Sequence, residues 1–80
     1  MYYLYILKCA DDSLYTGITI NLNQRVNQHN SSKRGAKYTR SRRPVKVVYT
    51  KKFANRPMAV KEELRIKKLS RKEKLKIIDN

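Results

Sequence analysis

The N-terminal quarter of the chain limits the fold more than any other segment, because it holds two strand-like runs joined by turn residues. Tyr2 to Lys8 is an aromatic and branched run that is typical of a β-strand. Asp11-Asp12-Ser13 supplies polar side chains that favour a turn. Leu14 to Ile20 has the composition of a second strand. These residues together predict an N-terminal β-hairpin.

The rest of the chain predicts helices around one further strand. We expect a helix over 21–30, a loop over 31–44, a strand over 45–53, a helix over 55–69 and a helix from 70 to the C-terminus. The helix starts rest on N-cap and first-turn residues, which are Asn21, Asn55 with Pro57, and Ser70 with Glu73.

The predicted order is therefore ββαβαα. It describes a small α/β (α+β) domain with a three-stranded, mainly antiparallel sheet flanked by helices. The 80 residues suit a single domain over 1–80, and a chain of this size buries only about 60% of its unfolded surface. A functional site is therefore expected in a surface cleft.

Positive charge is the strongest compositional signal. Lys and Arg number 20 against 6 Asp and Glu, which gives a formal net charge of +14 and a pI near 10.3. Such a balance indicates nucleic acid as the partner, although an anionic membrane, the ribosome or solubility alone would also fit a basic surface. Many of the cations lie in the 31–44 loop: Lys33, Arg34, Lys37, Arg40, Arg42 and Arg43.

The lack of a recognisable targeting segment and the single cysteine favour a cytoplasmic protein. No segment approaches the roughly 18 apolar residues of a membrane span, so no membrane partner is expected. The run from Met1 to Leu7 lacks the basic start and cleavage site of a signal peptide. Cys9 is the single cysteine, so neither an internal disulfide nor a zinc cluster is expected. Its apolar surroundings favour a buried structural thiol over a nucleophile.

The first helix carries two polar residues where apolar ones belong. Leu22, Arg25, Val26 and His29 have the i, i+3, i+4, i+7 spacing of a core-facing stripe. One interpretation is that Arg25 extends past the core edge and His29 is a satisfied histidine at its rim. The other is a functional pair, because a guanidinium held in place can donate two hydrogen bonds to a phosphate.

The second helix places a carboxylate in an apolar arc. Ala59, Val60, Leu64 and Ile66 form the arc, and Glu63 falls near its middle. Glu62 is expected at the solvent margin. A carboxylate among apolar groups is costly unless it is paired or bound to a metal. Glu63 is therefore either a salt-bridge partner of Lys67 or Arg25, or a metal-binding or catalytic group.

The tyrosines crowd the first hairpin, where core packing explains each of them taken singly. Tyr15-Thr16-Gly17 stands apart, since a glycine within a strand often marks the close approach of a ligand or of another backbone.

These residues together resemble the GIY-YIG nuclease family. Tyr3-Leu4-Tyr5 stands at the first family motif and Tyr15-Thr16-Gly17 at the second. Arg25 and His29 then follow on the first helix, and Glu63 on the helix after the third strand. The resemblance covers essentially the whole chain and is nearest to small stand-alone bacterial members, which share a loop of the Gly35 to Arg40 type. Many family nucleases also carry an Asn downstream of the metal-binding Glu. In this sequence the only Asn downstream of Glu63 is Asn80.

The resemblance implies hydrolysis of a phosphodiester by water with one divalent cation. Glu63 would bind Mg²⁺ or Mn²⁺, and Arg25 would bind the scissile phosphate. Tyr5 would be the general base, with a pKa lowered by the cation-rich site, and Tyr15 would place the water or share that role. His29 would orient the phosphate or relay a proton.

The resemblance also implies a set of residues that would bind nucleic acid around this site. Gly17 would let substrate approach. The remaining residues expected to contact nucleic acid, which would grip its backbone without reading sequence, are Lys33, Arg34, Lys37, Tyr38, Arg40, Arg42 and Arg43.

Two functions fit this sequence. The first is a metal-dependent endonuclease that cleaves nucleic acid, DNA before RNA, in repair or recombination, with a protein partner that supplies targeting. The second is a non-catalytic basic module that binds DNA or RNA with the same fold. Glu63 in an apolar arc favours the enzyme, because a pure binder has no need for it.

The shared-site mechanism requires Tyr5 and Tyr15 to lie on one face of the sheet. A two-residue turn would pair Tyr5 with Ile18 and place the two side chains on opposite faces. A loop with an odd number of residues, such as Ala10–Asp12, would place Tyr5 opposite Gly17 or Thr19 instead. We therefore predict an odd loop or a bulge, with Tyr5, Tyr15, Arg25 and Glu63 converging on one cleft.

Overall fold

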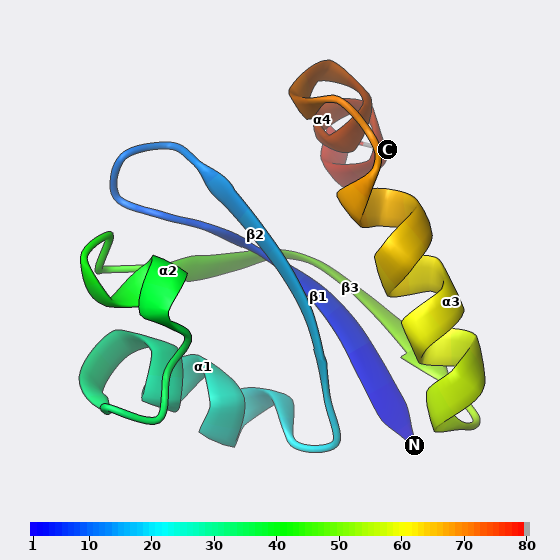
Figure 1. Cartoon of the computed structure of the whole chain (residues 1–80), viewed down its shortest axis with the longest axis horizontal. Helices are drawn as coiled ribbons and strands as arrows, with labels where there is room; N and C mark the ends of the chain where they lie inside the picture. Colours follow the sequence, from blue (N-terminus) through cyan, green and yellow to red (C-terminus); the bar gives the residue numbers. More distant parts are fainter. Residues whose placement is uncertain (80) are drawn as a thin grey trace.

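A computed structural model describes residues 1–79 as a three-stranded antiparallel sheet with helices on both faces (Figure 1). The elements in chain order are β1 (Tyr2–Lys8), β2 (Leu14–Thr19), α1 (Leu22–Ser31), α2 (Lys37–Arg40), β3 (Lys46–Phe53), α3 (Arg56–Lys67) and α4 (Arg71–Asp79). The predicted α+β class and antiparallel sheet are confirmed. Asn80, the only candidate for the downstream Asn of the family nucleases, lies outside the described residues.

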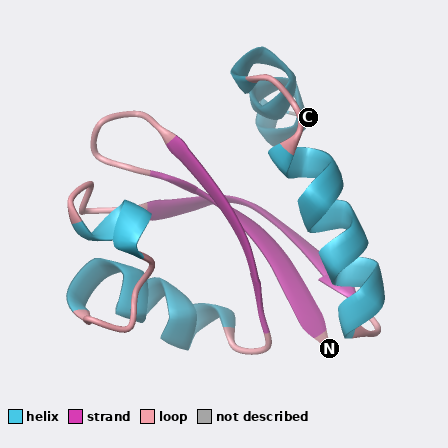
Figure 2. Cartoon of the chain, viewed as in Figure 1, coloured by secondary structure: helices cyan, strands magenta, loops and turns pink. Residues whose placement is uncertain are grey.

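Strand β1 forms the centre of the molecule. The sheet order is β2-β1-β3, and Leu4, Tyr5, Ile6 and Leu7 are all fully buried. Tyr5 and Leu7 pack toward α1, whereas Leu4 and Ile6 pack toward α3 and α4. Figure 2 shows the sheet between these two helical layers. Burial on both faces explains why β1 is a continuous apolar run and not an alternating one.

The hairpin register agrees with the prediction of an odd loop. The Cys9 amide donates to the Ser13 carbonyl over 2.9 Å, which closes a loop of Ala10, Asp11 and Asp12. Asp12 adopts a left-handed φ of 67°, which Asp tolerates better than most residues. Tyr5 consequently pairs with Gly17 and Leu7 with Tyr15. Both tyrosines therefore lie on the α1 face of the sheet.

The predicted helix starts are confirmed by their caps. The Asn21 side chain accepts from the Gln24 amide at 3.0 Å, and Asn55 accepts from the Met58 amide at 3.1 Å. At α4, Ser70 and Glu73 exchange the two hydrogen bonds of a capping box.

The 31–44 segment differs from the predicted loop, because it contains the short helix α2. The order is therefore ββααβαα. Gly35 makes this possible, since a Cβ there would lie 2.5 Å from the Gln28 carbonyl oxygen and 2.9 Å from the His29 Cα. The chain packs directly against the end of α1 and then turns, with the Thr39 and Arg40 amides bonded to the Ala36 carbonyl. A single helical turn has too little periodicity to be recognised in the sequence.

Candidate active site

Tyr5 lies directly against Gly17. A Cβ at Gly17 would lie 2.6 Å from the Tyr5 hydroxyl oxygen and 2.7 Å from the ring carbon that bears it. No side chain fits there without displacing the phenol. The close approach expected at this glycine is therefore made by Tyr5 of the protein itself.

A buried chain of hydrogen bonds runs from Tyr5 into α2. The Tyr5 hydroxyl lies 2.8 Å from His29 Nε2, and His29 Nδ1 lies 2.9 Å from Thr39 Oγ1. Tyr5 is 1% exposed, and His29 and Thr39 are 0% exposed. His29 is thus a fully buried, doubly bonded histidine, and its interpretation as a rim residue is wrong.

Aromatic contacts hold Tyr15 beside the same histidine. The Tyr15 and His29 rings meet edge to face with centroids 5.2 Å apart. The other partner of Tyr15 is Tyr38 of α2, stacked at 5.9 Å, and the Arg42 guanidinium lies 4.0 Å from the centre of the Tyr38 ring. Helix α2 therefore covers Tyr15 and His29 together.

Arg25 is anchored through one nitrogen. Its Nη1 donates to the Gln28 side chain at 2.9 Å and to the Arg34 carbonyl at 2.8 Å. A guanidinium has five N–H donors, so these two bonds fix its position and leave further donors for the Tyr5 hydroxyl and for a phosphate. The guanidinium also acts on the Tyr5 hydroxyl, whose pKa it lowers.

Glu63 and Glu62 on α3 are equally buried, and the prediction that Glu62 lies at the solvent margin is wrong. Their side chains are 17% and 16% exposed. Glu62 makes two bonds to Arg65, at 2.6 Å and 2.9 Å. Glu63 pairs with Lys67 at 3.3 Å, which is the i+4 salt bridge considered for it. Leu64, expected in the apolar arc, is 53% exposed because it points away from the sheet.

Burial raises the pKa of Tyr5 to about 12, against the lowering expected from the cation-rich site. Arg25 lowers this pKa, but Tyr15 and the Glu63 carboxylate raise it. The loss of water around a phenolate exceeds the benefit of the nearby cation. Tyr5 is consequently a neutral phenol at physiological pH, and the charges of both Arg25 and Glu63 affect its pKa.

His29 is neutral for a related reason. Burial lowers its pKa to about 4, and the charges of Arg25 and Arg43 lower it as well. A neutral imidazole has one nitrogen that donates and one that accepts. His29 can therefore accept the Tyr5 hydroxyl proton in a hydrogen bond.

Two of the loop arginines are used within the protein. Arg43 donates to the carbonyls of His29, at 2.6 Å, and of Gln28 and Ser32, and so closes the C-terminal end of α1. Arg42 joins the hairpin to α2 through Asp11 at 3.1 Å and the Tyr38 carbonyl at 2.8 Å.

The family model for the GIY-YIG catalytic domain matches residues 1–76. The chain belongs to the GIY-YIG family. Among curated relatives, UPF0213 proteins of Oceanobacillus iheyensis and Syntrophus aciditrophicus are 56% and 53% identical over 98% and 95% of this chain, and over 90% and 87% of their own lengths.

Solved structures agree with the fold. The solution NMR structure of a UPF0213 protein from Bacillus halodurans is 41% identical, with a TM-score of 0.64 over 99% of this chain and 84% of that one. A protein from E. faecalis is 44% identical, with a TM-score of 0.63 over 91% of this chain and 77% of its own. The predicted resemblance to small bacterial GIY-YIG proteins is confirmed.

In this GIY-YIG protein, a metal would depend on a single carboxylate. Residues 1–79 contain no group of three or more His, Cys, Asp or Glu side chains suited to an ion. Glu63 nevertheless fits Mg²⁺, which keeps several waters and shares ligands with substrate phosphates. Glu62 fits less well, because both of its oxygens are bonded to Arg65.

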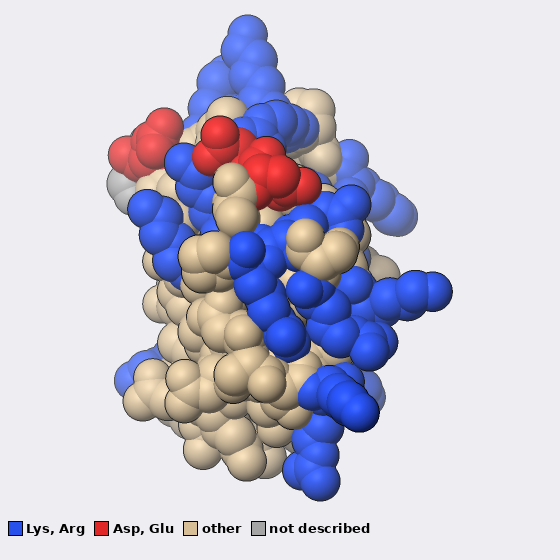
Figure 3. Space-filling view, turned by 90° about the vertical axis from the view of Figure 1, so that its left-hand side faces the viewer, with Lys and Arg blue, Asp and Glu red and all other residues tan. Residues whose placement is uncertain are grey.

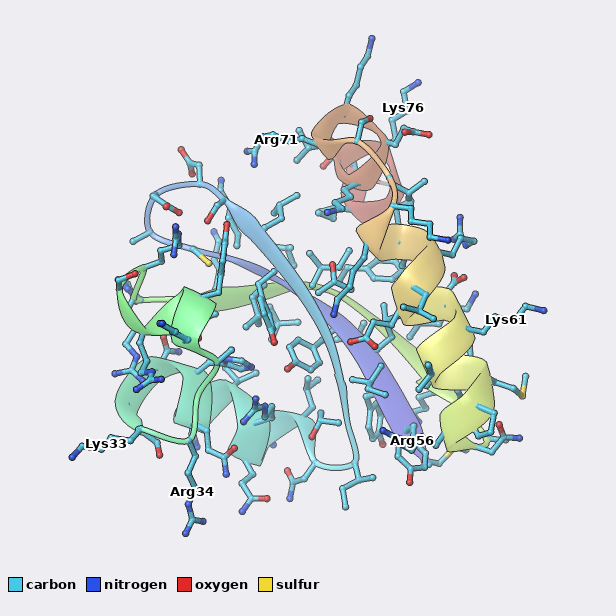
Figure 4. The ribbon with its side chains drawn as sticks, viewed as in Figure 1. Lys33, Arg34, Arg56, Lys61, Arg71 and Lys76 are labelled. Carbon is cyan, nitrogen blue, oxygen red and sulfur yellow. The ribbon has the colours of Figure 1, made fainter. Side chains whose placement is uncertain are left out.

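The exposed cations lie on two sides of the molecule. Lys33, Arg34, Lys37 and Arg40 are exposed around α2. Figure 4 shows Lys33 and Arg34 extending away from the sheet there, while Lys61 and Lys76 extend from α3 and α4 on the other side. On the side that carries α1 and α2, Lys and Arg gather over one part of the surface beside an area with neither charge (Figure 3).

Thr39 is the site residue that the sequence analysis missed. It lies within the recognised Gly35 to Arg40 loop, but a threonine between basic residues is an ordinary surface pattern. Its complete burial and its bond to His29 depend on contacts between α1 and α2. The expected burial of Cys9 is confirmed, at 4% exposure. No helix within 1–79 is long and apolar enough to cross a membrane.

The neutral His29 gives folding a defined pH dependence. In the unfolded chain His29 binds a proton near pH 6.5, whereas in the folded chain burial lowers the His29 pKa to about 4. The free energy of unfolding is therefore expected to decrease by about 3 kcal/mol as pH falls through that window. Urea unfolding at pH 7.0 and 4.5 measures it. His29→Gln is the control, since His29 is the single histidine. Equal pH dependence in both proteins would contradict the assignment.

Proposed function

We propose that this protein is a metal-dependent endonuclease that hydrolyses phosphodiester bonds, with DNA as the substrate. The observation that carries the proposal is the grouping around the Tyr5 hydroxyl. His29 Nε2 lies within hydrogen-bond distance of this hydroxyl, at 2.8 Å, and the charges of Arg25 and Glu63 both act on the Tyr5 pKa. A cation suited to phosphate and a carboxylate suited to a metal therefore both influence this proton-transfer group, in a chain that belongs to a catalytic-domain family.

Each residue then has a distinct task. Arg25 binds the scissile phosphate through the donors that Gln28 and Arg34 do not use, and its charge stabilises the transition state. Glu63 would hold Mg²⁺ or Mn²⁺ in place of its ion pair with Lys67, and the ion would supply stabilisation of the leaving oxygen. Tyr15 helps to place the attacking water.

Proton transfer by Tyr5 does not require a phenolate. The hydroxyl oxygen accepts a proton from the attacking water while its own proton moves to His29 Nε2 along the existing 2.8 Å hydrogen bond. The water oxygen bonds to phosphorus as it loses this proton, the bond from phosphorus to the leaving oxygen breaks, and His29, whose pKa is about 4, becomes a short-lived imidazolium. A neutral Tyr5, with a pKa of about 12, is compatible with this transfer.

A non-catalytic DNA- or RNA-binding module is the second candidate. It is favoured by the burial of Tyr5, which is 1% exposed, and by the ion pair of Glu63 with Lys67. The decisive assay incubates the protein with duplex, single-stranded, flapped and branched DNA and with RNA, in Mg²⁺ or Mn²⁺ against EDTA. Metal-dependent cleavage supports the enzyme. Binding without cleavage of any substrate supports the module.

Affinity for DNA is expected to fall steeply with salt, and the exposed cations beside α2 are expected to carry part of that dependence. Lys33→Ala with Arg34→Ala should reduce the slope of log K against log salt by about two, roughly one per lost phosphate contact. Fluorescence anisotropy over a salt series measures the slope. Arg42 and Arg43 are unsuitable for this test because they hold the fold together.

The matched control removes the same charge on the other side. Lys61→Ala with Lys76→Ala should change the slope by much less than the first pair, since these residues extend from α3 and α4 (Figure 4). Equal effects of the two pairs would show that DNA does not bind preferentially beside α2. A flat salt dependence of the wild type would remove nucleic acid as the partner.

A further inference from the structure

Thr39 occupies an unusual position for a loop threonine. It lies in α2, is 0% exposed, and contacts His29 Nδ1 at 2.9 Å. Its hydroxyl also donates to the Ala36 carbonyl oxygen at 2.9 Å. Three buried polar groups, those of Tyr5, His29 and Thr39, therefore form one continuous chain that ends on a backbone carbonyl.

The directions of these bonds follow from the hydrogens available. A threonine hydroxyl has one hydrogen, and in Thr39 it is directed to Ala36, so Oγ1 can only accept from His29. A neutral imidazole has one N–H, which must then be on Nδ1. Nε2 carries a lone pair, and the Tyr5 hydroxyl donates to it over 2.8 Å.

The opposite tautomer fits less well. A lone pair on Nδ1 would accept the Ala36 amide, which lies at the longer distance of 3.4 Å. Thr39 would then have to turn its hydrogen from the Ala36 carbonyl, which also accepts from the Thr39 and Arg40 amides, toward Nδ1. Tyr5 would have to accept from Nε2 and direct its own hydrogen elsewhere in a buried site.

We propose that Thr39 is a positioning residue that holds His29 in the Nδ1–H tautomer and thereby directs the Tyr5 hydroxyl hydrogen inward. With its hydrogen on His29, Tyr5 presents lone pairs, and not a donor, to the rest of the site. This is the orientation needed to accept a proton from water. The catalytic consequence rests on the proposed nuclease function, whereas the assignment of the tautomer does not depend on that function.

The surrounding contacts explain how the threonine is held. Gly35 allows the chain to lie against the end of α1, where a Cβ would be 2.9 Å from the His29 Cα. Arg43 bonds the His29 carbonyl at 2.6 Å. The Gly35 to Arg40 segment thus acts inward on His29, in addition to any role of its exposed cations.

The tautomer is directly measurable, because the chain has one histidine. Protein labelled with ¹⁵N in histidine should give, at pH 7, one protonated and one unprotonated ring nitrogen, with the proton on Nδ1. Thr39→Val removes the acceptor and should shift the ring toward the Nε2–H form, whereas Thr39→Ser should keep the wild-type pattern. A wild-type spectrum with the proton on Nε2 would overturn the proposal. So would a folded Thr39→Val protein with unchanged tautomer.

Activity is the second measurement. Thr39→Val is expected to lower metal-dependent cleavage by about 10-fold, less than the roughly 100-fold or more for loss of a proton-transfer group itself, while Thr39→Ser retains most of the activity. Equal loss in both variants would overturn the positioning role. If Thr39→Val does not fold, the wild-type and Thr39→Ser spectra still decide whether the His29 proton is on Nδ1, and a proton on Nε2 in either protein overturns the proposal. If no substrate is cleaved by wild type, the nuclease proposal fails while the tautomer result stands or falls alone.

Discussion

Glu63→Gln is expected to lower metal-dependent cleavage by about 100-fold or more while leaving DNA affinity nearly unchanged. The substitution keeps the size of the side chain but removes the negative charge that would hold Mg²⁺ or Mn²⁺, and losses of this order follow removal of one transition-state stabilising group. Its salt bridge to Lys67 is partly exposed, so losing it costs at most about 1 kcal/mol of stability. Cleavage rates at saturating DNA, with anisotropy for affinity, measure both effects.

Glu62→Gln is the matched control, since the two carboxylates are neighbours with nearly equal exposure of 16% and 17%. It should retain cleavage, because the Glu62 oxygens are already bonded to Arg65. Equal losses in the two variants would mean that α3 is disturbed as a whole. A Glu63→Gln protein that is less stable but fully active would assign the residue to its salt bridge alone.

Tyr5→Phe is expected to reduce cleavage by roughly 100-fold or more, the effect of losing a positioned proton-transfer group. The ring remains to pack above Gly17, so the sheet is preserved. His29 Nε2 loses its partner in a buried site, which should also cost about 1 to 3 kcal/mol of stability. Single-turnover cleavage and urea unfolding measure the two consequences separately.

Tyr15→Phe is the comparison that assigns the role. Its ring would keep the stack on Tyr38 and the contact with His29, so only a hydroxyl is lost. We expect a smaller loss of cleavage than for Tyr5→Phe. The reverse order would transfer the proton-accepting role to Tyr15, which is half-buried while Tyr5 is 1% exposed.

Local signals in the sequence predicted most of the secondary structure. The Asn21, Asn55 and Ser70 caps each satisfy backbone groups within three residues of the cap, so the interaction is already contained in adjacent residues. The hairpin parity was also predictable, because Tyr5 and Tyr15 could share a face only with an odd loop. Errors at the ends of elements were one or two residues, as for β2, which ends at Thr19.

The errors arose where distant segments meet. Arg42 and Arg43 look like phosphate-binding cations in a basic loop, yet they bond to Asp11 and to the end of α1. Glu62 looks like a solvent-facing neighbour of Lys61, yet Arg65 and Lys51 cover it. Arg65 lies at i+3 from Glu62 on the same helix, but no spacing along the chain encodes the contacts with Asp11, the end of α1 or Lys51.

The sequence by itself determined the fold class and the family, because alternation, helix caps and family motifs are contained in short stretches of chain. Only the tertiary structure decided how the residues around Tyr5 behave. Packing buries Tyr5 and raises its pKa to about 12, and it lowers that of His29 to about 4. It also places Thr39 against His29. Burial and hydrogen-bond direction depend on segments that are far apart in the chain, so they exist only once α1, α2 and the sheet have packed together.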